Sequence, residues 1–158
     1  MSTKDLEHRW KSRVAAVHPD RFAGASDAEK RVAMQWSASI NEAYRVLRDP
    51  LKRAQYLCDL AGFQTENLSN ASMDMDFLMQ QMQWREDLER IRDSQDANAL
   101  TVLANQIEAD RDSLQSNTAK LIEAQQWDAV VKRLQEWMFV EKLLQEIKSA
   151  ERALQTTQ

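Results

Sequence analysis

The sequence of 158 residues has few of the residues that interrupt helices, form disulfides or hold metal ions. It contains two glycines, two prolines, one cysteine and two histidines. Glycine and proline are the strongest helix breakers, so their scarcity among many Ala, Leu, Glu, Gln, Lys and Arg residues predicts an almost wholly helical chain. The single cysteine, Cys58, can form no internal disulfide and belongs to no metal-ligand spacing. We therefore expect no metal and no other cofactor, and interpret Cys58 as a buried packing residue.

Long hydrophobic runs are missing as well. No stretch approaches the roughly 20 apolar residues that cross a membrane, and the N-terminus lacks the apolar segment of a signal peptide. The sequence therefore predicts no membrane partner. A single cysteine fits a reducing compartment, so we expect a cytoplasmic location.

The net charge of −4 is unevenly distributed along the chain. Residues 1–61 hold eleven Lys and Arg against eight Asp and Glu, whereas residues 62–158 hold ten against seventeen. This asymmetry predicts two modules with different partners. The basic excess of the first module is weak and carries no groove-reading motif, which argues against nucleic acid as a partner.

Apolar residues recur at helical spacing in six segments. The first segment, about residues 4–17, ends before Pro19, and the second begins at the capping sequence SDAE, Ser26 to Glu29. A short third helix follows Asp49-Pro50 and closes at Gly62. Three longer segments cover about residues 74–93, 96–124 and 127–153, which suits an antiparallel bundle. The fold class is therefore all-α: a helical module over residues 1–61, a polar linker over 62–73, and a three-helix bundle over 74–158.

One turn interrupts this pattern, in the stretch AAVHPDRFAG from Ala15 to Gly24. It places His18 and Asp20 on either side of Pro19, between two amphipathic helices. By itself the tripeptide is a weak signal, and a solvated turn is its simplest interpretation. Proline restricts its neighbours, however, so the turn displays His18 and Asp20 with little conformational entropy left to lose on binding a partner.

The turn and its surroundings resemble the J-domain of heat-shock ATPase co-chaperones, because the stretch SINEAYRVLRDPLKRAQY supplies the matching second helix. Three further stretches, PLKRAQYLCDLAGF, DFLMQQMQWREDLERI and WDAVVKRLQEWMFVEKL, resemble the HscB family, the J-type co-chaperones of bacterial iron–sulfur cluster assembly. The resemblance covers almost all of residues 4–150. It implies that the first module docks on the chaperone HscA and stimulates its ATP hydrolysis, while the bundle delivers the cluster scaffold IscU.

The resemblance and the charge pattern together assign two sets of binding residues. Basic side chains beside the turn would orient an acidic chaperone surface. The predicted chaperone-binding residues are His18, Pro19, Asp20 and Arg21 in the turn, and Arg9, Lys11 and Arg13 on the helix before it. The resemblance maps the scaffold-binding residues onto Leu78, Met79, Met82 and Phe139.

A helical wheel gives a second argument for the scaffold-binding surface. Residues 74–93 carry two apolar stripes in roughly opposite sectors, one with Phe77, Trp84, Leu88 and Ile91, the other with Met75, Leu78, Met79 and Met82. A small bundle buries only one of them, and a methionine-rich stripe adapts well to a partner. On the last helix we expect Trp127, Val130, Val131, Leu134 and Met138 to form the core stripe and Phe139 to point away from it. The alternative is that the second stripe packs on the linker or on the first module.

One departure from the family bears on stability. Family members begin with an apolar helix that packs across the next two, and nothing in residues 1–5 replaces it. We therefore expect this J-domain helix to be absent or truncated, and the first module to be the less stable one.

Two other functions compete with the co-chaperone. A hydrolase could use His18 and Asp20 as an orienting pair, but a nucleophile, oxyanion donors and a pocket signature are missing, so we expect no enzymatic activity. A structural helical adaptor without an ATPase partner is the alternative to a co-chaperone.

Overall fold

The computed structural model describes residues 2–65 and 73–157. Every secondary-structure element in these ranges is a helix, which confirms the all-α class. None of these helices is both long and apolar enough to span a bilayer. The chain divides into two compact units, Met1–Tyr56 and Leu57–Gln158. The domain bounds predicted from the sequence stay a prediction, because residues 66–72 of the expected linker lie outside the described ranges.

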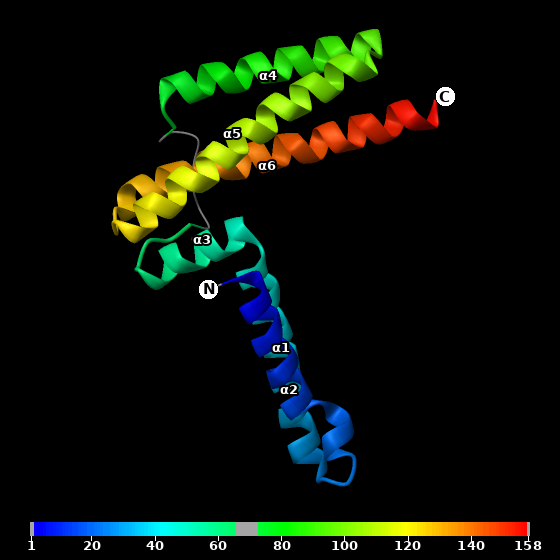
Figure 1. Ribbon diagram of the computed structural model, residues 1–158, viewed down its shortest axis with the longest axis vertical. Coiled ribbons are helices and arrows are strands. Elements are labelled where there is room, and N and C mark those ends of the chain that lie inside the picture. Colours follow the sequence, from blue (N-terminus) through cyan, green and yellow to red (C-terminus); the bar gives the residue numbers. More distant parts are fainter. Residues whose placement is uncertain (1, 66–72, 158) are drawn as a thin grey trace. The chain divides into compact units, whose positions relative to one another are not determined.

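The first unit is a helical hairpin of α1 (Thr3–Val17) and α2 (Asp27–Arg48), joined by a short 3-10 helix, η1 (Pro19–Phe22). Figure 1 shows η1 at the tip of this hairpin. The helix α1 ends because His18, which precedes a proline, has extended dihedral angles of φ −60° and ψ 134°. The predicted cap of α2 is confirmed, since the Ser26 hydroxyl accepts a hydrogen bond from the Glu29 N–H.

Helix α3 (Pro50–Leu60) begins in the first unit and ends in the second. The Asp49 carboxylate accepts hydrogen bonds from the N–H groups of Leu51, at 2.9 Å, and Lys52, at 3.1 Å, so the predicted Asp-Pro start is confirmed. The helix ends where Gly62 adopts a left-handed φ of 91°. Cys58 is fully buried, as predicted, and burial raises the pKa of its thiol.

The two helices of the hairpin cover each other only partly. Trp10 of α1 stacks on Tyr44 of α2 with ring centroids 4.4 Å apart, and its indole N–H donates to the Asn41 side chain. On the neighbouring face of α2, however, Val32 and Trp36 are 50% and 60% exposed. In the described part of α1 and α2 only Ala33 is buried. This unit therefore has a thin apolar core.

The second unit contains α4 (Met75–Ser94), α5 (Ala97–Glu123) and α6 (Trp127–Thr156). Figure 1 shows α4 alongside the first part of α5 and the second part of α6. All three helices contribute to one core, whose buried members are Trp84, Leu88, Ile91, Leu100, Leu103, Ala104, Ile107, Val140, Leu143, Leu144, Ile147 and Ala150. The predicted bundle is thus present, and most of the apolar burial of the chain lies in it.

Candidate functional site

The loop at the tip of the hairpin is fixed by its own short contacts. His18 caps η1, because its Nδ1 accepts a hydrogen bond of 3.3 Å from the Asp20 N–H. The same Nδ1 lies 3.5 Å from the Asp20 carboxylate. The two side chains are nevertheless open to solvent, 50% exposed for His18 and 93% for Asp20. The loop is therefore ordered locally and accessible, which is what recognition by a partner requires.

The basic residues predicted to flank this loop are all exposed, and they differ in how free their charges are. Lys11 forms an ion pair of 2.8 Å with Glu7 on the same helix, which raises the pKa of Lys11 and lowers that of Glu7. Arg9, Arg13 and Arg21 make no ion pair within the described part of the chain. Three guanidinium groups thus remain available beside the loop, whereas the positive charge of Lys11 is balanced by the carboxylate of Glu7.

Helix α4 leaves one apolar stripe uncovered, as the wheel predicts. Trp84, Leu88 and Ile91 are buried, whereas Met75, Met79 and Met82 are 63–70% exposed. Leu78 is half-buried beside them. We call the four residues Met75, Leu78, Met79 and Met82 the methionine surface. Three flexible thioether side chains on one exposed face are typical of a surface that adapts to a partner.

The predicted core stripe of α6 is wrong at two adjacent residues. Met138 is 38% exposed rather than buried, and Phe139 is half-buried and packs against the core instead of pointing away from it. The stripe was extrapolated from the first part of α6. Four consecutive residues of α6, Leu134 to Trp137, are buried, and the core shared with α4 and α5 continues from Val140 to Ala150, so burial on α6 does not follow one narrow stripe.

Phe139 sits between two side chains of α4. The Phe77 and Phe139 rings are nearly perpendicular, at 88°, with their centroids 6.1 Å apart. The guanidinium carbon of Arg85 lies 5.3 Å from the centroid of the Phe139 ring, over its face. Arg85 in turn forms a two-armed ion pair with Glu146 of α6, at 2.8 Å and 3.3 Å. Phe139 therefore contacts α4 at Phe77 and at Arg85, and Arg85 lies next to Leu78 of the methionine surface on the helical wheel.

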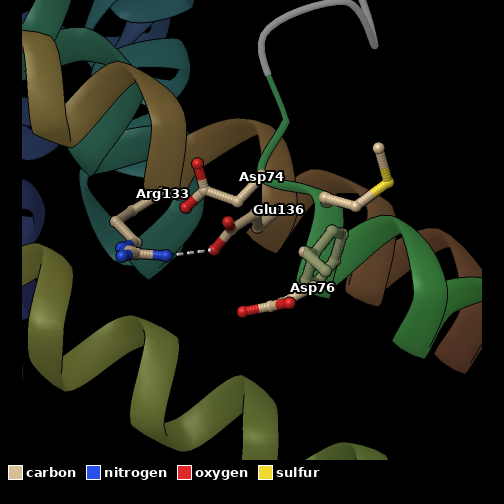
Figure 2. Close-up of a pocket in the computed structure, with 6 residues that line it drawn as sticks. Asp74, Asp76, Arg133 and Glu136 are labelled. Atoms are coloured by element: carbon tan, nitrogen blue, oxygen red, sulfur yellow. Dashed lines mark hydrogen bonds and ion pairs between the residues drawn. The ribbon is translucent and has the colours of Figure 1, made fainter.

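A hollow of about 610 Å³ lies at the beginning of α4, lined by Asp74, Met75, Asp76, Phe77, Arg133 and Glu136. Figure 2 shows the Arg133 guanidinium joined to the Glu136 carboxylate, a contact of 2.7 Å, with the two aspartates nearby. Asp76 lies in the first helical turn, where negative charge is favourable. Among the described residues no group of three or more His, Cys, Asp or Glu side chains is arranged to hold a metal ion.

Comparison with known proteins decides the family. The model of the HSCB C-terminal oligomerisation domain matches residues 73–148. The co-chaperone protein HscB homolog of Bordetella avium is 50% identical over 121 residues, which are 77% of this chain and 71% of that protein. The homolog of Bordetella petrii is 52% identical over 118 residues, 75% of this chain and 68% of that protein. The chain belongs to the HscB family.

Solved structures of HscB proteins share the fold as well. Chaperone HscB from Vibrio cholerae is 30% identical and matches with a TM-score of 0.85 over 98% of this chain and 91% of its own. Human co-chaperone protein HscB is 26% identical, with a TM-score of 0.87 over 94% of this chain and 74% of its own. Membership in the HscB family carries a co-chaperone role in iron–sulfur cluster assembly.

Within this HscB fold the predicted site residues fall into two separate sets. The turn residues and the basic residues of α1 lie on the hairpin, and the methionine surface and Phe139 lie on the bundle. Sequence reasoning missed Arg85 and Glu146. They lie 61 positions apart on different helices, and each has the ordinary signature of a solvated helix face. Only the packing of α4 on α6 shows that they meet beside Phe139.

Proposed function

We propose that this chain docks on an HscA-type heat-shock ATPase through the loop His18-Pro19-Asp20 and delivers an IscU-type cluster scaffold held on the bundle. The observation that carries the proposal is the pairing of two exposed surfaces on one chain. The accessible loop, with its free arginines, lies on the hairpin unit, and the methionine surface lies on the bundle unit. Each surface has the chemistry of a protein-binding site rather than that of a catalytic centre.

The two surfaces suit two kinds of partner. Arg9, Arg13 and Arg21 flank the exposed Asp20, so a chaperone surface that offers carboxylates together with a basic group would match the loop. The methionine surface has no such charge pattern and would match an apolar patch on the scaffold. Family membership and the match of the bundle to the HscB C-terminal model support this division of labour.

Delivery and stimulation follow from simultaneous binding. A scaffold held on the bundle is presented to the chaperone at high effective concentration once the loop has docked. The loop raises the rate of ATP hydrolysis if it binds the hydrolysis-competent state of the chaperone more tightly than the other state. In this scheme the chain itself supplies no catalytic group. We place the process in the cytoplasm.

The decisive measurement is the single-turnover ATPase rate of the chaperone, with this protein, with purified IscU, and with both. We expect an increase with this protein alone and a larger increase with both. No increase in either mixture would refute chaperone stimulation and would leave a structural adaptor as the better interpretation. A protein that hydrolyses ATP on its own would contradict the proposal in a different way.

A further inference from the structure

Arg85 lies at the boundary between the buried face and the exposed face of α4. On a helical wheel it lies between the core residue Leu88 and the half-buried Leu78. Its side chain is 40% exposed and that of Glu146 is 30% exposed. Both oxygens of Glu146 are engaged by the guanidinium, at 2.8 Å and 3.3 Å. A forked pair of this kind fixes the plane of the guanidinium as well as its position.

The fixed guanidinium lies over the ring of Phe139. The distance of 5.3 Å from the guanidinium carbon to the ring centroid is within the range of a cation–π contact. Phe77 also contacts the Phe139 ring, in a perpendicular arrangement with centroids 6.1 Å apart, and Phe77 is itself nearly perpendicular to Trp84 at 6.3 Å. Phe139 is therefore held from the core by Phe77 and from the solvent side by Arg85.

We infer that Arg85, held by Glu146, is a positioning residue that fixes the Phe139 ring beside the methionine surface in the orientation that the scaffold binds. The inference rests on the proposed scaffold-binding function. A ring that is ordered before docking loses less entropy on binding, so the ion pair contributes affinity without touching the partner. The surface that the scaffold meets is thus a set of flexible methionines beside one rigid aromatic ring.

The test compares scaffold binding with stability in matched variants. Purified IscU is titrated against the full-length chain carrying Arg85→Gln, Glu146→Gln or Arg111→Gln. Arg111 of α5 is the control because it lies 4.0 Å from Glu141 of α6 in the same bundle and the two side chains are similarly exposed, at 29% and 34%. Its shorter ion pair, of 3.3 Å, is with Asp112 of its own helix. Glu141 lies about 200° around α6 from Phe139, on the opposite side of the helix. We expect Arg85→Gln and Glu146→Gln to weaken binding roughly five- to tenfold, and Arg111→Gln to leave it unchanged.

A charge-reversed pair separates positioning from plain stability. The double variant Arg85→Glu with Glu146→Arg restores an ion pair between α4 and α6, so its melting temperature should return toward that of the parent. It removes the guanidinium of residue 85 from the ring, and the shorter, negatively charged glutamate in its place has no attraction to the ring face. We therefore expect binding to stay weak. The ring signals of Phe139 in NMR spectra should shift in every variant at Arg85 and stay unchanged in Arg111→Gln.

Two results would overturn the inference. One is parent-like binding by Arg85→Gln, or by the equally uncharged Arg85→Met if the glutamine variant does not fold. The other is full recovery of binding in the charge-reversed pair. Failure of the proposed function has a different signature: Met79→Ala and Met82→Ala would then leave IscU binding unchanged as well. Weak binding of these methionine variants together with parent-like binding of the Arg85 variants would retain the scaffold site and reject the positioning role.

Discussion

His18 uses one ring nitrogen inside its own turn. Because Nδ1 accepts the Asp20 N–H, the neutral ring carries its proton on Nε2. The residue therefore offers a hydrogen-bond donor on the nitrogen farther from the turn, while Asp20 offers an almost fully exposed carboxylate. The ring of Pro19 between them fixes the φ angle of that residue, which limits how far the two groups can move relative to each other. The chemistry of this loop is a donor and an anion at a set spacing.

Substitutions that alter one of these groups should separate docking from folding. We expect His18→Gln, which changes the donor geometry, and Asp20→Asn, which removes the charge, each to abolish stimulation of the chaperone. Both side chains are exposed, so the far-ultraviolet circular dichroism of the chain should not change. Single-turnover ATP hydrolysis by the chaperone is the measurement. Stimulation that survived either substitution would contradict the role assigned to this loop.

At the scale of single helices, the apolar residues predicted to bind the scaffold differ in burial between α4 and α6. The methionine surface is exposed, whereas Phe139 packs against Phe77 and the core. The two parts of the predicted scaffold-binding set therefore differ in what they do for folding. Removing side-chain atoms from an exposed position leaves no cavity, but removing them from Phe139 does.

Alanine substitutions should expose this difference. Met79→Ala with Met82→Ala should weaken scaffold binding by roughly tenfold or more while leaving the melting temperature nearly unchanged. Phe139→Ala should weaken binding and also destabilise the bundle by about 1–2 kcal/mol, roughly half the cost of truncating a fully buried phenylalanine. Calorimetry for binding and thermal unfolding for stability are the measurements. A large fall in melting temperature for the methionine pair would show that these residues belong to a packed interface.

The helices themselves were predictable because local chemistry sets their ends. Ser26 and Asp49 cap the starts that the sequence indicates, and Gly62 closes α3 in the left-handed conformation. The wheel also separated the two stripes of α4 correctly, since a single straight helix fixes those angles. Local signals of this kind need no knowledge of the neighbouring helices.

Features that depend on the packing of one helix against another were not predictable from the sequence. The sides of Met138 and Phe139 were predicted wrongly because the face of α6 that is buried there depends on its packing with α4 and α5. The ion pair between Arg85 and Glu146 was missed for the same reason. A periodic pattern gives the faces of one helix, and the register between two helices follows from packing that one sequence does not reveal.

On the scale of the whole molecule, the two units bury very different amounts of apolar surface. In the bundle, three helices enclose a core of large side chains such as Leu88, Ile107 and Leu143. In the hairpin, Trp10 and Tyr44 stack, but Val32 and Trp36 of α2 are at least half exposed. Apolar burial is the dominant stabilising term in folding, so the free energy of opening should be lower for the hairpin.

Amide hydrogen exchange read by mass spectrometry measures that difference directly. We expect amides of α1 and α2 to exchange faster than those of α5 and α6, through openings that leave the bundle folded. The same peptides in denaturant give the intrinsic rates and correct for sequence effects. Docking of the chaperone on the loop should slow exchange in the hairpin and not in the bundle, because a ligand stabilises the unit that it binds. Equal protection of α1 and α5 in the free chain would show that contacts beyond the stacked Trp10 and Tyr44 close the hairpin core.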